Sequence, residues 1–213
     1  MEDHVIITIA RGYGSGGKTV GRMLAKELGI NCYDREIIRM ASEESGINEK
    51  YFNLADEKLK KTLMHKLMTN VYSGELISPE SEDFVSDDNL FNFTAKVLKD
   101  LAEVESYVAI GRCADFVLRD NPDVISVFVH APMEYCIPKA MERLYKSAEE
   151  CEKYIRETDQ YRGNFYRYYT GHTWNDAYNY DLCLDSSKLG FQGCVDAIRA
   201  YMAVRAKYKN AEK

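Results

Sequence analysis

The amino-acid sequence predicts an α/β fold in which helices cover both faces of a parallel sheet. Short apolar runs alternate with longer amphipathic segments, a pattern typical of repeated strand–helix units. The first apolar run leads through a glycine-rich segment directly into a helical pattern. With 213 residues, 46% of them hydrophobic, the chain can bury a sizeable core, so we expect a single domain spanning residues 1–213.

Five short apolar runs are the expected strands. Residues 5–10 (VIITIA) carry no charge and are rich in β-branched side chains, as expected for a strand buried on both faces. The other strands are expected at residues 30–33, 107–110, 124–129 and 181–184. Ligands bind beyond the carboxyl ends of the strands in sheets of this kind. The residues expected along that edge are 11–19, Asp34, Arg112 and His130.

Helices are expected wherever apolar residues recur at three- and four-residue spacing. Val20, Leu24 and Leu28 mark one face of the first helix, which follows the glycine-rich segment and ends at Gly29. The others are expected over residues 35–45, 48–75, 89–104, 113–119, 132–145, 147–169 and 190–209.

The composition argues against several classes of protein. A net charge of −6 and a pI near 5.4 disfavour a broad nucleic-acid surface but allow a local anion site. Much of the acidity lies in residues 78–88, which we expect to form a solvated loop. None of the six cysteines forms a C-x-x-C pair, so reduced thiols are expected. Without a signal-peptide pattern or a membrane-length apolar run, the chain is expected to be cytoplasmic, with no membrane partner.

The glycine-rich segment matches the phosphate-binding pattern G-x-x-x-x-G-K-[ST] in full. Its glycines allow backbone N–H groups to surround phosphate oxygens, and the following helix N-terminus adds partial positive charge. Lys18 can reach the β- and γ-phosphates of a nucleotide, and the Thr19 hydroxyl can bind Mg²⁺. A plain strand–helix turn needs fewer glycines than this segment contains. The positions expected to bind the nucleotide are Gly12, Tyr13, Gly14, Ser15, Gly16, Gly17, Lys18 and Thr19.

Phosphoryl transfer also requires cations near the transferred group, because its negative charge is spread over several oxygens. The candidates in this sequence are Arg112, Arg143, Arg156, Arg162 and Arg167. Arg112 ends a predicted strand at the ligand edge, whereas Arg167 is expected to be a solvated surface charge.

Several motifs, taken in order, resemble the cytidylate kinase-like family over about residues 6–202. They are the phosphate-binding segment, residues 33–36 (YDRE), Gly111-Arg112, residues 131–135 (APMEY), Asp159-x-x-Arg162 and residues 174–185. The resemblance implies an ATP-dependent nucleoside monophosphate kinase with a P-loop NTPase fold and a five-stranded parallel sheet. It also implies a monophosphate-binding insertion over about residues 35–105 and a helical lid over about residues 145–172.

The resemblance assigns roles to individual residues. Asp34, Arg112 and Asp159 fall on positions that hold the phosphate acceptor in the family, and Asp115 is the acid nearest to Arg112 in this part of the chain. Arg143 and Arg162 fall on positions near the transferring phosphate, where they would act with Lys18 as catalytic cations. The implied small molecules are ATP, Mg²⁺ and a CMP-like acceptor, and the chain could form a homo-oligomer.

The chain departs from the family pattern at positions that concern the acceptor. Cys113 follows Arg112 where cytidylate kinases have Asp, Ile155 replaces a basic residue, and Arg35 follows Asp34 in place of a Ser-Gly turn. Two alternatives therefore remain open. The acceptor could be a hydroxyl-bearing metabolite, with Asp34 or Asp115 as general base, or the protein could be a nucleotide-binding sensor without turnover.

Aromatic residues follow the lid motif. Tyr161, Tyr166, Tyr168 and Tyr169 could stack on a base, but packing of an amphipathic helix on the sheet is favoured. Trp174 is expected in the core or at an interface.

Overall fold

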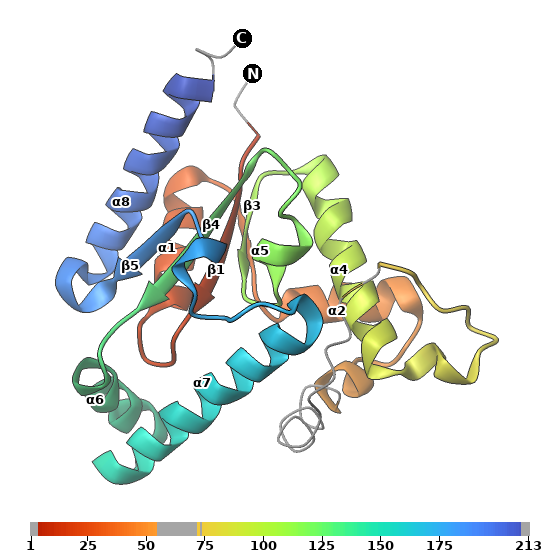
Figure 1. Cartoon of the computed structure of the whole chain (residues 1–213), viewed down its shortest axis with the longest axis horizontal. Helices are drawn as coiled ribbons and strands as arrows, with labels where there is room; N and C mark the ends of the chain where they lie inside the picture. The colour runs from red at the N-terminus through yellow and green to blue at the C-terminus, as the bar shows by residue number, and fades with distance from the viewer. Residues whose placement is uncertain (1–3, 55–71, 73, 210–213) are drawn as a thin grey trace.

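Five parallel strands form one sheet in the computed structural model, which describes residues 4–54, 72 and 74–209. The sheet order is β2-β3-β1-β4-β5 (Figure 1). The strands are β1 (Ile6–Arg11), β2 (Asn31–Tyr33), β3 (Tyr107–Ile110), β4 (Val124–His130) and β5 (Leu182–Asp185). The predicted fold class is confirmed, and each predicted strand lies within a residue or so of its observed position.

The central strand β1 determines where the functional edge lies. It pairs in parallel with β3 on one side and with β4 on the other, from Ile6↔Tyr107 and Ile6↔Val124 onwards. Ile6, Ile7 and Ile9 are fully buried, as their β-branched side chains predict. The chain continues to β2 and β3 on one side of β1 and to β4 and β5 on the other, so the strand order switches at β1. Sheets of this kind bind ligands beyond the carboxyl ends of the strands at such a point.

Two helices cover one face of the sheet. The helix α1 (Gly17–Leu28) packs Val20 and Leu24 against the strands, and α8 (Ser186–Lys209) adds Val195 and Ile198 to the same cluster. The path of α8 breaks at Gly190, whose φ of 67° and ψ of 177° are not helical. The expected helix 190–209 therefore corresponds to the part of α8 beyond this break.

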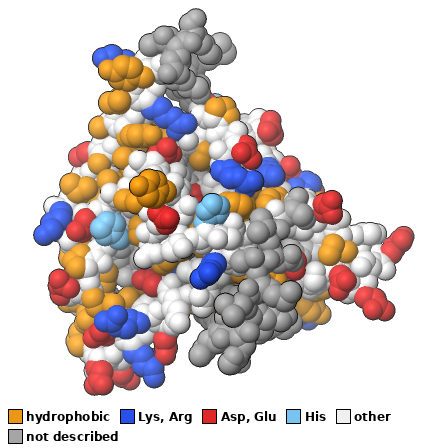
Figure 2. Space-filling model, in the orientation of Figure 1, with side chains coloured by type: hydrophobic (Ala, Val, Ile, Leu, Met, Phe, Trp, Pro, Cys, Tyr) orange, Lys and Arg blue, Asp and Glu red, His pale blue; other side chains and the backbone are white. Residues whose placement is uncertain are grey.

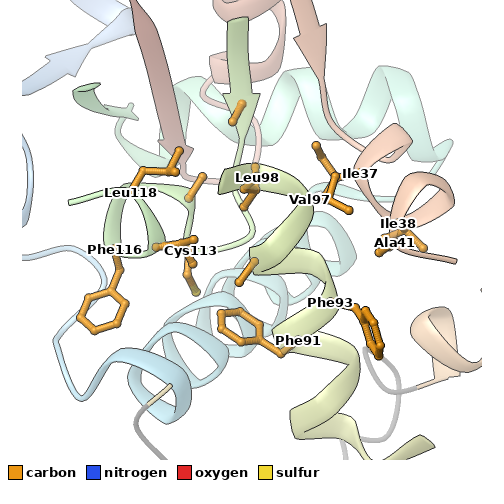
Figure 3. Close-up of a cluster of buried hydrophobic side chains, with 14 of the residues drawn as sticks. Ile37, Ile38, Ala41, Phe91, Phe93, Val97, Leu98, Cys113, Phe116 and Leu118 are labelled. Carbon is orange, nitrogen blue, oxygen red and sulfur yellow. The ribbon is translucent and has the colours of Figure 1, made fainter. Parts of the chain in front are cut away.

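A second and larger cluster covers the opposite face. It brings together α2 (Glu36–Ser45), α4 (Asp87–Val104) and the short helix α5 (Ala114–Val117). Figure 3 shows side chains of α2 and α4 facing one another, with Ile37 and Ile38 on α2, and Val97 and Leu98 on α4.

The remaining two long helices lie at the carboxyl ends of the strands. These are α6 (Met133–Leu144) and α7 (Ala148–Thr170), and α7 crosses below the ends of the strands in Figure 1. Ser147 and Glu150 form a capping box that begins α7, and Gly171 ends it in the left-handed conformation. The helix α7 corresponds to most of the segment predicted as the lid.

The predicted helix over residues 48–75 is wrong at its far end. Residues 49–54 are helical, but residues 72 and 74–78 are not; most of the segment between lies outside the described residues. Asn side chains of α4 hold this irregular stretch, because Asn92 Nδ2 donates to the Glu75 carbonyl and Ile77 N–H donates to Asn89 Oδ1. Tertiary hydrogen bonds thus replace those of a local helix.

An acidic segment precedes α4 and projects from the molecule. It contains the 3₁₀ helix η1 (Glu82–Val85), and its acids Glu80, Glu82 and Asp83 are exposed, as expected for a solvated segment. Figure 2 shows acidic side chains gathered over this projection at the right of the view. A second 3₁₀ helix, η2 (Ala177–Asn179), lies between α7 and β5. No helix in the described part of the chain combines the length and apolar composition needed to cross a membrane.

Candidate nucleotide and phosphoryl-transfer site

The glycine-rich segment forms a tight loop between β1 and α1. Gly14 and Gly16 have φ of 80° and 79°, in the left-handed region that favours glycine. A Cβ atom on Gly14 would lie 2.7 Å from Cys136 Cβ, and one on Gly16 would collide with the Phe191 ring. The Ser15 hydroxyl donates to the Gly12 carbonyl at 2.9 Å and closes the turn. Neighbouring residues therefore leave no room for a side chain at Gly14 or Gly16.

This loop opens into a cavity of about 680 Å³ at the functional edge. Its walls include the predicted residues of the phosphate-binding loop except Ser15, together with Asp34, Arg112, Asp115, Arg143 and Arg162. Tertiary folding thus brings together side chains from α1, the β2–α2 connection, the β3–α5 connection, α6 and α7. Asp159 is the one predicted acceptor residue that does not line this cavity.

Cationic side chains dominate the walls. Eight of the lining residues are Lys or Arg, whereas only Asp34 and Asp115 are acidic. The cations are Arg11, Lys18, Arg22, Arg35, Arg112, Lys139, Arg143 and Arg162. The chain as a whole carries a net charge of −6, so this concentration runs against its overall composition. Such a cavity attracts polyanionic ligands and holds their phosphates by charge-assisted hydrogen bonds.

Arg11, the last residue of β1, interacts electrostatically with Arg162, Asp34 and other charged residues around it. Desolvation, with repulsion from Arg162, lowers the pKa of Arg11 to about 10. Its guanidinium passes over Gly111, where a Cβ atom would collide with Arg11 Nη1. Sequence reasoning placed Arg11 at the functional edge but did not select it as a site residue. Its position directly before Gly12 was the available signal.

Lys18 forms an ion pair with Asp34 across the mouth of the loop. Desolvation would raise the pKa of Asp34, but the hydrogen bond from Lys18 and the charge of Arg11 outweigh it, and the pKa lies below its usual value. Asp34 is therefore a carboxylate at neutral pH. This ion pair brings the lysine of the phosphate-binding loop into contact with the carboxylate predicted to hold the acceptor.

Three consecutive residues after β3 have left-handed backbone conformations. Gly111, Arg112 and Cys113 have φ of 73°, 61° and 53°. For Arg112 and Cys113 this conformation costs about 1–3 kcal/mol each, and such strain concentrates at functional sites. The turn directs Arg112 to the cavity wall while the buried Cys113 begins α5. Cys113 therefore belongs to the structural part of this turn.

Asp115 lies in the wall formed by α5 and α7. It is buried, and its carboxylate accepts a hydrogen bond of 2.6 Å from the Tyr166 hydroxyl. Desolvation raises its pKa to about 6, although the bond from Tyr166 acts in the opposite direction. A carboxyl group of this kind can change its protonation state near neutral pH.

Asp159 and Arg162 fasten α7 to the phosphate-binding loop. The Tyr13 N–H donates to both Asp159 oxygens, at 2.8 and 3.1 Å. Arg162 Nη1 donates to Asp159 Oδ1 at 2.9 Å and to the Arg11 carbonyl at 3.1 Å. The structure thus places Asp159 against the loop itself, while Arg162 reaches the cavity. Desolvation raises the pKa of Asp159, with the charge of Arg162 opposing that effect.

Ile155, which replaces a basic residue of the family pattern, is a core residue. It is 2% exposed and packs with Cys136 and Cys151 between α6 and α7. A buried apolar contact between these helices therefore takes the place of a charge. Tyr166 and Tyr169 are also buried in the core, as the packing interpretation predicted. Tyr161 and Tyr166 both line the main cavity.

The residues present fit a nucleotide with Mg²⁺. Thr19 is exposed in the first turn of α1, beside the loop that would hold the phosphates. Nowhere in the described residues do three or more His, Cys, Asp or Glu side chains gather as a metal site. Mg²⁺ in kinase sites takes one or two protein ligands and completes its shell with phosphate oxygens and water. Thr19 with a bound triphosphate satisfies that requirement.

Other cavity residues were not selected from the sequence. Arg22 lies one turn after Lys18 on α1, and Lys139 places its ammonium 4.2 Å from the centre of the Tyr135 ring and 4.7 Å from that of Phe191. Helical spacing from Lys18 could have indicated Arg22. Lys139 could not have been found, since its place depends on how α6 packs against the start of α8.

Comparison with known proteins agrees with this geometry. Solved structures that share the fold include an uncharacterized protein from Eubacterium ventriosum and a shikimate kinase from Bacteroides thetaiotaomicron. The first has a TM-score of 0.68 at 24% identity and covers 94% of this chain and 99% of its own. The second has a TM-score of 0.53 at 12% identity, with 93% and 98% covered. A search of curated proteins finds no significant match. Residues 6–188 match the family described as the cytidylate kinase-like family, so the chain belongs to that family and has the fold of a P-loop kinase.

Proposed function

We propose that this protein transfers the terminal phosphoryl group of ATP to a nucleoside monophosphate, with a CMP-like acceptor as the first candidate. The excess of cations in the main cavity carries this proposal. Eight cationic side chains face two carboxyl groups there, one of which has a pKa of about 6. A phosphate monoester adds about −1.5 to −2 charges at pH 7, so a phosphorylated acceptor beside a triphosphate uses this charge better than a neutral metabolite.

The donor would lie in the loop of residues 12–19. Backbone N–H groups and the start of α1 would hold its phosphates, and Lys18 would exchange its contact with Asp34 for the β- and γ-phosphates. Mg²⁺, held by Thr19 and the phosphates, would neutralise charge on the triphosphate.

The acceptor would lie on the side of the cavity formed by Asp34, Arg112 and Asp115. An oxygen of its phosphate would form a bond to the γ-phosphorus while the bond from that phosphorus to the bridging oxygen of ADP breaks. Lys18, Arg143 and Arg162 would stabilise the charge that develops on the transferred group.

This chemistry needs no general base, because the attacking phosphate oxygen is already deprotonated. That suits Asp34, whose pKa lies below its usual value and therefore far from the range of an efficient base at neutral pH. The hydroxyl-metabolite alternative would instead need a base, and Asp115, with its pKa of about 6, is the group that could serve.

The test is an ATP-consumption screen with Mg²⁺, comparing CMP, dCMP, UMP, AMP and GMP with a panel of hydroxyl metabolites. The proposal is supported if a monophosphate is phosphorylated and Asp115→Asn lowers that turnover less than about tenfold. Loss of a general base would lower the rate about 10²–10⁴-fold. If only a hydroxyl metabolite is phosphorylated, and Asp115→Asn abolishes that turnover, the acceptor is a hydroxyl metabolite and the proposed monophosphate is wrong. If no acceptor is phosphorylated while ATP still raises the melting temperature, the proposal fails in favour of a nucleotide sensor.

A further inference from the structure

A second cavity, of about 480 Å³, lies on the other side of α7 from the main cavity. It is enclosed by the end of β4, the start of α6, one face of α7 and the loop that follows α7. Its side-chain lining includes Phe128, His130, Asp159, Asn164, Arg167 and Trp174. None of these residues except Trp174 lines the main cavity.

The helix α7 separates the two cavities by presenting a different face to each. Residues 155, 159, 163 and 167, spaced by four, line the second cavity. Residues 154, 158, 161, 162 and 165 line the main cavity. Positions four apart lie on one face of a helix, so two distinct walls are built from a single segment. Gly12, Tyr13 and Trp174 border both cavities.

Aromatic rings from β4 and from the loop after α7 line the second cavity. The rings of Phe128 and Trp174 meet edge to face, with centroids 5.3 Å apart. The His130 ring lies nearly parallel to Phe128, at 26° and 6.2 Å. The sequence predicts Trp174 in the core or at an interface and His130 only along the ligand edge. Instead, both contribute to a concave surface of the kind that binds planar rings.

Polar side chains converge on the same space. Arg167 is exposed, as predicted from the sequence, and within the described residues no carboxylate or hydrogen-bond acceptor pairs with its guanidinium. The side-chain amides of Asn164 and Asn175 line the cavity and likewise have no hydrogen-bond partner in the described part of the chain. Its one carboxylate, on Asp159, is occupied by the Tyr13 N–H and by Arg162. The cavity therefore offers donors and a positive charge, with its negative charge already compensated.

Gly163 independently indicates that the second cavity is kept open for a ligand. It lies inside α7, where glycine costs about 0.5–1 kcal/mol relative to alanine. A Cβ atom there would meet nothing within 4 Å, so close packing does not explain the glycine. The residue lines the second cavity, and the lack of a side chain keeps that space open.

We propose that the second cavity binds a small anion that carries a planar ring, with the ring on Phe128 and Trp174 and the anionic group at Arg167. The site is separate from the phosphoryl-transfer cavity, and ATP can occupy the loop at the same time. Its ligand contacts Gly12 and Tyr13 from the side opposite to the nucleotide.

The experiment uses the full chain saturated with Mg²⁺ and a non-hydrolysable ATP analogue, so that the main cavity is filled. Nicotinate is compared with nicotinamide, which keeps the ring without the charge, and with cyclohexanecarboxylate, which keeps the charge without the planar ring. Binding is followed by the fluorescence of Trp174, the single tryptophan of the chain, and by ligand-observed NMR. We expect saturable nicotinate binding with a Kd of about 1 mM or tighter, and binding about tenfold weaker for each of the other two.

Variants locate the bound ligand. Arg167→Gln is expected to weaken nicotinate binding about tenfold, as loss of one charge-assisted contact implies, with ATP-analogue affinity unchanged. Arg156→Gln is the matched control, because Arg156 is an exposed arginine of the same helix that pairs with Glu152. Gly163→Leu should block the cavity, whereas Gly163→Ala should leave room; if the leucine variant does not fold, Arg167→Gln still decides.

Four results would overturn the proposal. They are absence of nicotinate binding, equal binding of nicotinamide, unchanged affinity in Arg167→Gln, and displacement of nicotinate by the ATP analogue. The last would place the ligand in the main cavity.

Discussion

The two ends of the main cavity are built in different ways. The phosphate-binding end consists of consecutive residues, 12–19, whose shape follows from glycines in left-handed conformations and from the start of α1. The proposed acceptor end combines Asp34, Arg112, Asp115 and Arg162, which come from three separate parts of the chain. The first end depends on local backbone chemistry, whereas the second depends on how the elements pack. Substitutions at the phosphate-binding end should therefore change mainly the rate of phosphoryl transfer. Substitutions at the acceptor end should change both this rate and the stability of the fold.

The largest effect is expected at the phosphate-binding end. Lys18→Ala removes the cation that would contact the transferred phosphate and should lower kcat/KM by about 10²–10³-fold, or about 2.7–4 kcal/mol. The measurement is steady-state ATP turnover with the best acceptor of the screen. Lys26→Ala, an exposed lysine on the same helix, is the control and should be neutral. A loss of less than tenfold for Lys18→Ala would show that this loop does not bind the transferring phosphates.

The next effect concerns stability at the acceptor end. The folded-state pKa of Asp115, about 6, lies above its ordinary value of 3.8, so between these values the folded protein binds a proton that the unfolded chain releases. The contribution of Asp115 to the free energy of unfolding is therefore greatest at low pH. It falls as pH rises, by at most about 1.4 kcal/mol per pH unit. Above about pH 6 the loss is complete.

Asp115→Asn keeps an acceptor for the Tyr166 hydroxyl but removes the titration. The free energy of unfolding is measured by denaturant titration from pH 4 to pH 7 for both proteins. The wild type should lose stability relative to the variant as pH rises through this range. A constant difference across the range would exclude the raised pKa.

Arg162 joins the two ends, since it contacts Asp159 and the Arg11 carbonyl and also reaches the cavity. Arg162→Ala should reduce kcat about ten- to a hundredfold, corresponding to about 1.5–3 kcal/mol for a charged hydrogen-bond donor. It should change ATP affinity less than kcat. Arg156→Ala, the exposed arginine on α7, is the control. An equal loss of affinity and turnover would assign Arg162 to ground-state binding.

The smallest effect separates backbone strain from side-chain contact. Gly46 and Gly111 have similar φ of 71° and 73°, but only at Gly111 would a Cβ atom collide, with Arg11. Gly46→Ala should cost about 1–2 kcal/mol from the left-handed conformation alone. Gly111→Ala should cost more and should also reduce turnover, because Arg11 must move. Equal unfolding free energies for both variants, with unchanged turnover, would show that the position of Arg11 does not matter.

Much of the fold followed from the sequence because its signals are local. Apolar runs predicted the five strands, and amphipathic spacing with Gly29 predicted where the first helix ends. The helix prediction failed at residues 72, 74 and 75 because side chains of α4, distant in the sequence, provide hydrogen bonds to this stretch and to Ile77 just after it. A propensity for helix cannot reveal such partners.

By itself, the sequence determined the phosphate-binding loop and the parallel sheet, since both depend on residues that are neighbours in the chain. Only the tertiary structure decided that Asp159 holds the Tyr13 N–H, that Lys18 meets Asp34, and that α7 separates two cavities. These contacts join residues 16 to 146 positions apart in the chain. Their geometry follows from how helices and loops pack around the strand ends, which no local pattern encodes.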